Sequence, residues 1–270
     1  MTDIHTPLIQ KIQEVLEADS RVCAAWLEGS LARKEDDDLS DIDLWICVED
    51  NAFQEFIDQR EIFATKIGPV LSLLYPKTHN QPDDLDSFQV IFHDQPITCH
   101  LDVDVQKASR DFVFTKDSAA EEHRMLFDRK KVIQTVDGNA KELQAYLHTL
   151  TEFTLTQFWH RLPHVLVLLE RENLLAAMAS YRERLDDLVT LYRIVYTPEK
   201  TDWGFKDIEA DLPKDVLHTL EDCTAELSLK SLKKSTRMLA KAVEKQMKLL
   251  RKHVHVEFPS SLVDAVNEVL

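Results

Sequence analysis

The hydrophobic pattern of this 270-residue chain changes its period near Gly138. Before that position, short runs of residues alternate between apolar and polar, which is typical of strands, and helical patterns are mixed with them. After it, the apolar residues follow the 3.6-residue period of helices and glycine almost disappears. The change predicts an α+β fold: an N-terminal α/β head with a mixed sheet over residues 1–137, then a C-terminal helical bundle over residues 138–270.

In the head, helices are expected near the start of the chain and over residues 52–66. Strands are expected in the runs RVCAAWLEG, SDIDLWICVED, VLSLLY, SFQVIF and ITCHLDVDV. The helices expected in the C-terminal half cover residues 139–170, 172–196, 213–228 and 230–255. Pro163 is expected to kink or split the first of these, because proline removes one helical hydrogen bond.

Glycine is scarce, and its distribution excludes two common nucleotide-binding loops. The four glycines are Gly29, Gly68, Gly138 and Gly204, so no two of them fall in one short loop. A dinucleotide-binding G-x-G-x-x-G motif and a phosphate-binding G-x-x-x-x-G-K-[ST] motif are therefore both absent from the chain.

The net formal charge is −16, and the acidic residues are concentrated in the first half. Residues 1–135 contain 27 Asp and Glu against 14 Lys and Arg. Such a body repels polyanions, which argues against nonspecific nucleic-acid binding as the main activity. It remains compatible with a small anion that is held through metal ions.

The cysteines are widely spaced and lie in no metal-binding motif, so a zinc site is not expected. They are Cys23, Cys47, Cys99 and Cys223. We expect buried free thiols and a reducing, cytoplasmic environment. The chain begins without a secretory signal pattern, and no segment is long and apolar enough to span a membrane. A membrane partner is therefore not expected.

The stretch LEGSLARKEDDDLSDIDLWICVED carries the clearest chemistry. An apolar strand ends at Gly29 and Ser30, where small residues let backbone N–H groups approach phosphate oxygens. The next strand presents Asp41 and Asp43 on one face, because side chains two residues apart in a strand point the same way. Paired carboxylates of this kind suit Mg²⁺ ions that keep phosphate oxygens as their other ligands.

Asp-x-Asp alone is not specific in so acidic a chain, since Asp36 with Asp38 and Asp84 with Asp86 also fit it. The combination of a Gly-Ser turn after an apolar strand, the spacing to Asp-x-Asp and a later acidic strand is much rarer. This combination resembles the DNA polymerase β-like nucleotidyltransferase superfamily. Over nearly its full length the chain looks most like the lincosamide and aminoglycoside nucleotidyltransferases, by its size, its LFD segment at residues 126–128 and its helical second half.

The resemblance implies roles for particular residues. Asp41, Asp43 and Asp102 would be the catalytic carboxylates and would ligate two Mg²⁺ ions, with Asp104 as the alternative third ligand. Nucleotide-binding residues would be Gly29, Ser30 and Arg33. Lys34 departs from the family pattern, in which glycine usually follows the Ala-Arg pair, and this departure leaves the role of Arg33 open.

The implied activity is Mg²⁺-dependent transfer of a nucleoside monophosphate, most simply from ATP, to a hydroxyl of a small molecule such as an aminoglycoside or lincosamide. The helical domain would bind this acceptor. Crowded carboxylates without metal would have raised pKa values. One alternative is a protein or nucleic-acid acceptor, and the negative charge of the chain argues against the nucleic acid. The other alternative is a noncatalytic nucleotide sensor of the same fold.

Other features of the sequence have structural as well as functional interpretations. A basic stripe recurs at spacings of three or four in the last long helix, and it predicts either a solvated face or a contact to the triphosphate. Its members are Lys230, Lys234, Arg237, Lys241, Lys245, Lys248 and Lys252. His160 with His164 and Glu170 with Glu172 are more typical of polar helix surfaces than of a metal site or a general base. Trp45 shares the face of Asp41 and Asp43, as core or as pocket wall.

Overall fold

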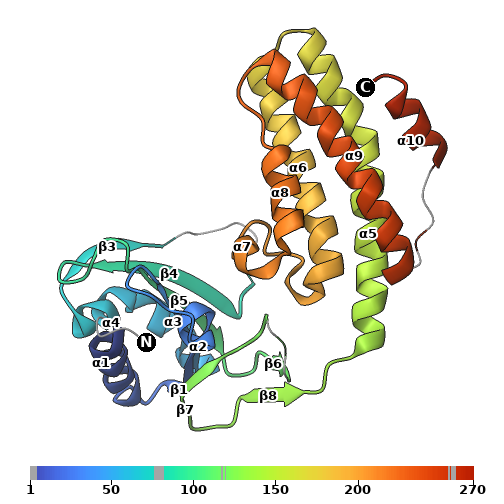
Figure 1. Ribbon diagram of the computed structural model, residues 1–270. Coiled ribbons are helices and arrows are strands. Elements are labelled where there is room, and N and C mark those ends of the chain that lie inside the picture. Colours follow the sequence, from blue (N-terminus) through green and yellow to red (C-terminus); the bar gives the residue numbers. More distant parts are fainter. Residues whose placement is uncertain (1–4, 76–81, 117, 119, 255, 257–259) are drawn as a thin grey trace. The chain divides into compact units, whose positions relative to one another are not determined.

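The computed structural model describes residues 5–75, 82–116, 118, 120–254, 256 and 260–270. The chain divides into two compact units, Met1–Gly138 and Asn139–Leu270 (Figure 1). The first unit combines a mixed sheet with helices and the second is helical, so the predicted α+β class is confirmed.

The first unit contains a six-stranded sheet and a separate two-stranded sheet. Its helices are α1 (His5–Glu17), α2 (Gly29–Arg33), the 3₁₀ turn η1 (Asp50–Ala52), α3 (Phe53–Asp58) and α4 (Arg60–Ile67). Its strands are β1 (Val22–Leu27), β2 (Ile42–Val48), β3 (Val70–Leu74), β4 (Leu85–Phe92), β5 (Leu101–Lys107), β6 (Phe112–Thr115), β7 (Arg124–Asp128) and β8 (Ile133–Val136). The large sheet has the order β3-β4-β5-β2-β1-β7, in which β2 and β5 run parallel.

Helices α1, α3 and α4 cover one face of the large sheet (Figure 1). The buried residues of α1 recur at helical spacing, with Leu8, Ile12 and Leu16 on the sheet side. Strand β2 alternates as predicted: Ile42 and Leu44 are buried in this core, while Asp43 is half-buried on the opposite face. Strand β1 is buried along its whole length, because both faces of the sheet are covered there.

Three details of the head differ from the sequence-based expectation. Strand β5 begins at Leu101 rather than at Ile97, because a turn closed by the Cys99 N–H and the Pro96 carbonyl, 2.9 Å apart, precedes it. Strands β6, β7 and β8 were not predicted, since runs of four or five residues are too short to show a period. The helix expected over residues 52–66 is broken at Gln59 into α3 and α4.

The second unit is built on three long helices, α5 (Ala140–Glu170), α6 (Leu174–Tyr196) and α9 (Leu229–His253), which share one hydrophobic core. The shorter elements are η2 (Pro198–Lys200), α7 (Ile208–Asp211), α8 (Lys214–Asp222) and α10 (Ser260–Asn267). Pro163 lies inside α5, which continues as one helix, so the predicted split does not occur. Burial of Trp159, Leu162 and Val165 around it offsets the lost hydrogen bond.

A buried arginine, Arg193, stabilises the segment after α6 through hydrogen bonds to residues 204–211. Arg193 is fully buried, and its guanidinium donates to the carbonyls of Gly204, at 2.7 Å, and Lys206, and to the Asp211 carboxylate at 2.9 Å. Lys200 also donates to Asp211, at 2.7 Å. Burial by itself would raise the pKa of Asp211, but these two cations hold it below its usual range. The charges are thus paired and hydrogen-bonded, as buried charges need to be.

The four cysteines are free and buried, as predicted. Within the described residues, no helix is both long enough and apolar enough to cross a bilayer.

Candidate active site

The candidate site lies among the central strands of the large sheet, at the end where β1 finishes and the parallel strands β2 and β5 begin. The register aligns Asp43 of β2 directly with Asp102 of β5, and Trp45 with Asp104. Partners in register project from the same face of a sheet, so the three carboxylates lie together. The β1 end is fixed there by the Glu28 N–H, which donates to the Asp43 carbonyl at 3.0 Å. The sheet therefore brings the Gly29 turn and the carboxylates together, although they are up to 75 residues apart in the sequence.

Gly29 is required by both its conformation and its neighbour. Its φ is +66°, in the left-handed region, and a Cβ added there would lie 1.9 Å from Oδ2 of Asp43. The backbone of this turn thus passes directly over a carboxylate. Helix α2 begins at Gly29, and the side chain of its N-cap residue, Glu28, makes no capping hydrogen bond. Uncapped N–H groups at a helix start are donors suited to phosphate oxygens.

If the chain has the nucleotidyltransferase activity that its sequence resemblance implies, we expect Gly29→Ala to lower the rate of transfer by about 100-fold, because displacing a catalytic group by 1 Å has an effect of that order. The left-handed conformation adds about 1–2 kcal/mol of strain. The matched control is Gly204→Ala, since Gly204 has φ +54° but nothing within 4 Å of an added Cβ. Backbone strain should lower Tm in both variants, whereas displacement of Asp43 by the new Cβ should lower kcat/KM only in Gly29→Ala. A fully active Gly29→Ala enzyme would contradict the assignment of this turn.

Asp102 and Asp104 carry the electrostatic signs of a crowded acidic site. Burial, then the charges of Asp43 and Asp41, raise the pKa of Asp102. Burial and the charges of Asp102 and Asp43 raise the pKa of Asp104 to about 6. Oδ1 of Asp102 is buried and has no hydrogen-bond partner. The raised pKa values agree with the sequence-based prediction, and the unsatisfied oxygen is an atom that a cation would satisfy.

Glu28 is an additional acidic residue of this site that the sequence analysis missed. Burial raises the pKa of Glu28 to about 7, and the charges of Asp104 and Asp43 add to the effect. The Trp26 indole N–H donates to its carboxylate at 2.9 Å and partly counters this shift. The position of Glu28 directly before the Gly-Ser turn could have predicted its role, because a residue at the end of that strand lies near the start of the acidic strand.

The raised pKa values of Glu28 and Asp104 predict how stability depends on pH. Both groups bind protons more tightly in the folded chain than in the unfolded chain, where their pKa values are about 4. Their contribution to stability is therefore complete below pH of about 4 and is lost as the pH rises through about 6 and 7. We expect the metal-free protein to have a higher Tm near pH 6 than near pH 8. Glu28→Gln should reduce this difference, and Glu61→Gln on the exposed side of α4 should not.

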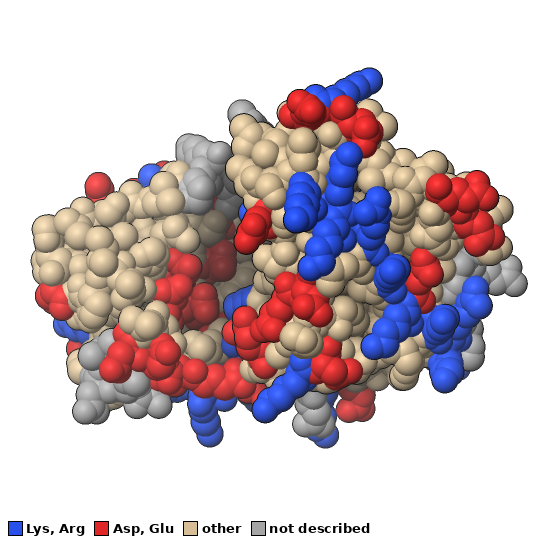
Figure 2. All heavy atoms as spheres, turned by 45° about the horizontal axis from the view of Figure 1, so that its top comes forward, with Lys and Arg blue, Asp and Glu red and all other residues tan. Residues whose placement is uncertain are grey.

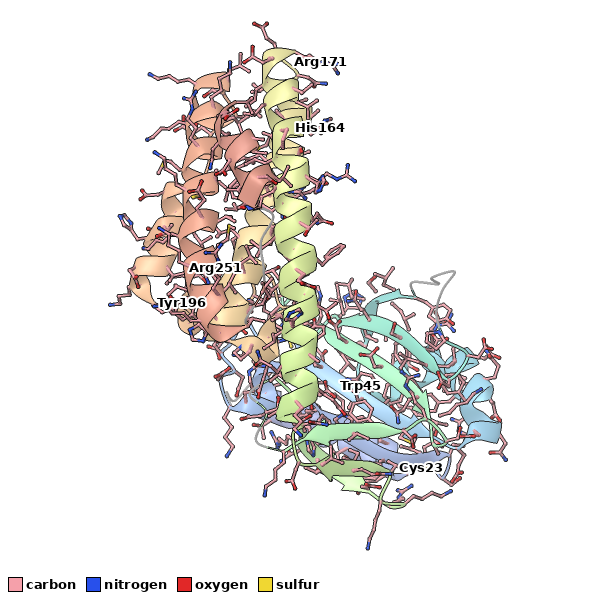
Figure 3. All side chains as sticks on the ribbon, turned by 90° about the vertical axis from the view of Figure 1, so that its right-hand side faces the viewer. Cys23, Trp45, His164, Arg171, Tyr196 and Arg251 are labelled. Carbon is pink, nitrogen blue, oxygen red and sulfur yellow. The ribbon has the colours of Figure 1, made fainter. Side chains whose placement is uncertain are left out.

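An aromatic cluster lies beside the carboxylates on the same sheet face. Trp45 stacks on Trp26, with ring centroids 5.7 Å apart and planes 10° apart, and Phe112 of β6 meets both rings edge-on. Trp45 lies within the strands of the head (Figure 3). It belongs to a small hydrophobic cluster and is half-buried. The cluster holds the β6–β8 sheet against the large sheet next to the candidate site.

The remaining residues of the predicted motif differ in exposure. Asp41 is exposed just before β2, and Ser30 is half-buried within α2. Arg33 forms an ion pair with Glu35, with 2.7 Å between Nε and Oε2. Lys34 ends α2 in the left-handed conformation, at φ 59°. Glycine adopts this conformation freely, whereas lysine at this position carries a strain of about 1–2 kcal/mol.

The competing acidic pair of β4 is engaged in structural contacts. Asp84 forms an ion pair with Arg110 at 2.7 Å, and Asp86 accepts a hydrogen bond from the Tyr75 hydroxyl at 2.6 Å. Among the described residues, no group of three His, Cys, Asp or Glu side chains is arranged to hold a metal ion by itself. Mg²⁺ commonly completes its coordination with phosphate oxygens and water, so a site of few carboxylates remains compatible with it.

The candidates in the helical unit have surface positions. His160 and His164 are exposed on α5, and Figure 3 shows His164 on its outer side. Glu170 is exposed and accepts a hydrogen bond from Lys233 at 2.7 Å, which lowers the pKa of Glu170. Glu172 is exposed after the end of α5. All seven residues of the basic stripe are exposed on α9.

An α+β head with strand-borne carboxylates beside a Gly-Ser turn, followed by a helical unit, defines the class of protein: the chain is a nucleotidyltransferase. The family model described as streptomycin adenylyltransferase matches residues 4–270, and the chain belongs to that family. The predicted resemblance to antibiotic nucleotidyltransferases is thereby confirmed.

No curated protein matches the sequence significantly. Among solved structures, an aminoglycoside 6-adenyltransferase from Bacillus subtilis is similar to this chain, with 14% identity and a TM-score of 0.42. The alignment covers 97% of this chain and 94% of the Bacillus subtilis chain. Membership of the family follows from the family model, which spans almost the whole sequence.

Proposed function

We propose that this enzyme transfers the adenylyl group of ATP, with Mg²⁺, to a hydroxyl of a small cationic acceptor of the aminoglycoside class. The observation that carries the proposal is the register of β2 with β5, which sets Asp43 beside Asp102 at the Gly29 turn. Family membership supports adenylyl transfer as the reaction.

The Gly29–Ser30 turn would bind the triphosphate. The uncapped N–H groups at the start of α2 and the Ser30 hydroxyl are donors of the kind that hold β- and γ-phosphate oxygens. The glycine allows close approach, because a side chain at position 29 would fill the space in front of Asp43. Arg33 already pairs with Glu35, so a phosphate contact from its guanidinium would require that ion pair to open.

Asp41, Asp43 and Asp102 would hold the metal ions. The donor set fits Mg²⁺: the ligands are carboxylate oxygens, and Oδ1 of Asp102 is buried without a partner. Asp104 fits less well as the third ligand, since its register partner on β2 is Trp45, whereas the partner of Asp102 is the carboxylate Asp43. Mg²⁺ bound there would neutralise the phosphates and lower the pKa of the acceptor hydroxyl.

The residues of the chain would align the reaction rather than form a covalent intermediate. The turn fixes the phosphates, the acceptor hydroxyl attacks the α-phosphorus, and pyrophosphate leaves on the opposite side. A cationic acceptor suits the acidic head, whose residues 1–135 carry 27 acidic against 14 basic side chains. The helical unit, residues 138–270, would bind the acceptor.

Two measurements test the proposed function. Incubation with ATP, Mg²⁺ and a panel of aminoglycosides and lincosamides should produce an acceptor with the mass of one added adenylyl group and release pyrophosphate. Isothermal titration with a nonhydrolysable ATP analogue and Mg²⁺ should show binding that is lost in the Asp41→Asn, Asp43→Asn double variant. Nucleotide binding without pyrophosphate release for any acceptor would support a noncatalytic sensor, and unchanged binding by the double variant would refute the proposed site.

A further inference from the structure

The exposed side of α9 carries a charge pattern to which the proposed function assigns no role. The helix contains nine Lys and Arg but only one acidic residue, Glu244. The seven exposed cations of the basic stripe extend from Lys230 to Lys252, which corresponds to about 33 Å along a helix axis. Figure 2 shows blue side chains gathered in one band on this unit.

Among the described residues, Glu244 is the acidic side chain that lies against the stripe, where it lines a pocket together with Arg237 and Lys241. The six lysines of the stripe form no ion pair within the described part of the chain, and Arg237 donates to the Leu270 carbonyl. Glu244 accepts a hydrogen bond from the Asn267 amide at 2.7 Å, and outside the stripe Lys233 binds Glu170. Like charges three or four residues apart destabilise a helix, and a merely solvated face would mix both signs. An anionic partner would relieve this repulsion.

The surroundings of the stripe restrict the kind of partner. The apolar side of α9, including Leu232, Leu239, Val243 and Leu250, is buried in the core of the helical unit and is not free to insert into a lipid bilayer. The stripe itself contains no apolar side chain. A protein partner would need an apolar centre in the interface, because exposed ion pairs alone contribute little binding free energy. A nucleic acid differs from a bilayer and from a protein partner, because each of its phosphates that is neutralised releases condensed counterions, and this release favours binding without apolar contacts.

We propose that the basic stripe binds the phosphodiester backbone of a nucleic-acid strand through charge, without reading its sequence. A strand with 3.4 Å between phosphates presents about ten phosphates along the length of the stripe. The excess negative charge is carried mainly by residues 1–135, with 27 acidic against 14 basic side chains, so the helical unit itself repels a polyanion only weakly. The nucleic acid is a docking partner of the helical unit and not the acceptor of the adenylyl group.

The test is fluorescence anisotropy with a labelled 20-nucleotide RNA, as single strand and as duplex, and with the DNA duplex of the same sequence. The stripe variant is Lys241→Gln, Lys245→Gln, Lys248→Gln, and the control is Lys131→Gln, Lys141→Gln, Lys214→Gln, three equally exposed lysines elsewhere. We expect the stripe variant to bind at least about 10-fold more weakly. The slope of log K against log salt should fall by about 2 for the single strand and about 3 for the duplexes.

Tm of each variant confirms that it is folded. No binding by the wild-type protein at about 50 mM salt, or an equal loss in the control variant, would overturn the proposal. Binding to vesicles containing anionic lipid, with no binding to any of the nucleic acids, would assign the stripe to a membrane surface instead. Adenylyl transfer to a small acceptor is measured in parallel. Loss of nucleic-acid binding with transfer retained supports the proposal, whereas loss of transfer with nucleic-acid binding retained would assign the stripe to the triphosphate and overturn it.

Discussion

Replacing Asp43 with asparagine is expected to lower kcat/KM for adenylyl transfer by about 100- to 1,000-fold, the range seen when one preorganised electrostatic group is removed. Asp43 lies in register with Asp102 and directly against the Gly29 turn. It therefore adjoins both the proposed metal ligand Asp102 and the turn that would bind the triphosphate. Asparagine preserves the shape but removes the charge that holds Mg²⁺. The rate should be measured by pyrophosphate release at saturating Mg²⁺.

Stability provides the second measurement for this variant. The charge of Asp43 raises the pKa values of Glu28, Asp102 and Asp104, so its removal relieves repulsion within the site. We therefore expect the metal-free Asp43→Asn protein to melt no lower than the wild type while activity is lost. Asp38→Asn is the matched control, because Asp38 is an exposed member of a competing Asp-x-Asp pair and should remain fully active. An active Asp43→Asn enzyme would refute the site.

Arg193→Met is expected to destabilise the helical unit by about 3–5 kcal/mol, the usual cost of removing one partner of a buried charge pair. Arg193 is fully buried, and its loss leaves Asp211 and the carbonyls of Gly204 and Lys206 without their donor. Because the pKa of Asp211 is lowered in the folded protein, this stabilisation is present at neutral pH and is lost as the pH falls through that lowered value.

Urea denaturation followed by far-ultraviolet circular dichroism measures this loss, since long helices dominate the second unit. Arg182→Met is the matched control. Arg182 lies on the same helix but is exposed, and exposed substitutions usually change stability by less than about 0.5 kcal/mol. Equal effects of the two substitutions would show that the contacts of Arg193 do not fasten the loop after α6.

Periodicity was sufficient to predict the strands that carry the candidate site. In β2 the alternation of Ile42 and Leu44 with Asp43 is strict, because one face is buried and a shift of one residue would bury the carboxylate. The long helices of the second unit were equally clear, although Pro163 does not interrupt α5. Prediction failed at Ile97, where a local turn delays β5, and in β6 to β8, which are too short for a pattern.

Within the candidate site, the sequence by itself determined which residue types occur and at what spacing: the Gly29–Ser30 turn, Asp-x-Asp, and an acidic strand with two possible third carboxylates. Only the tertiary structure decided that Asp102 aligns with Asp43 while Asp104 aligns with Trp45, because register depends on hydrogen bonds between strands that are distant in sequence. It also brought Glu28 into the site and set a Cβ at position 29 against Asp43. Local pattern specifies which face a side chain occupies, whereas the pairing of strands specifies its neighbours.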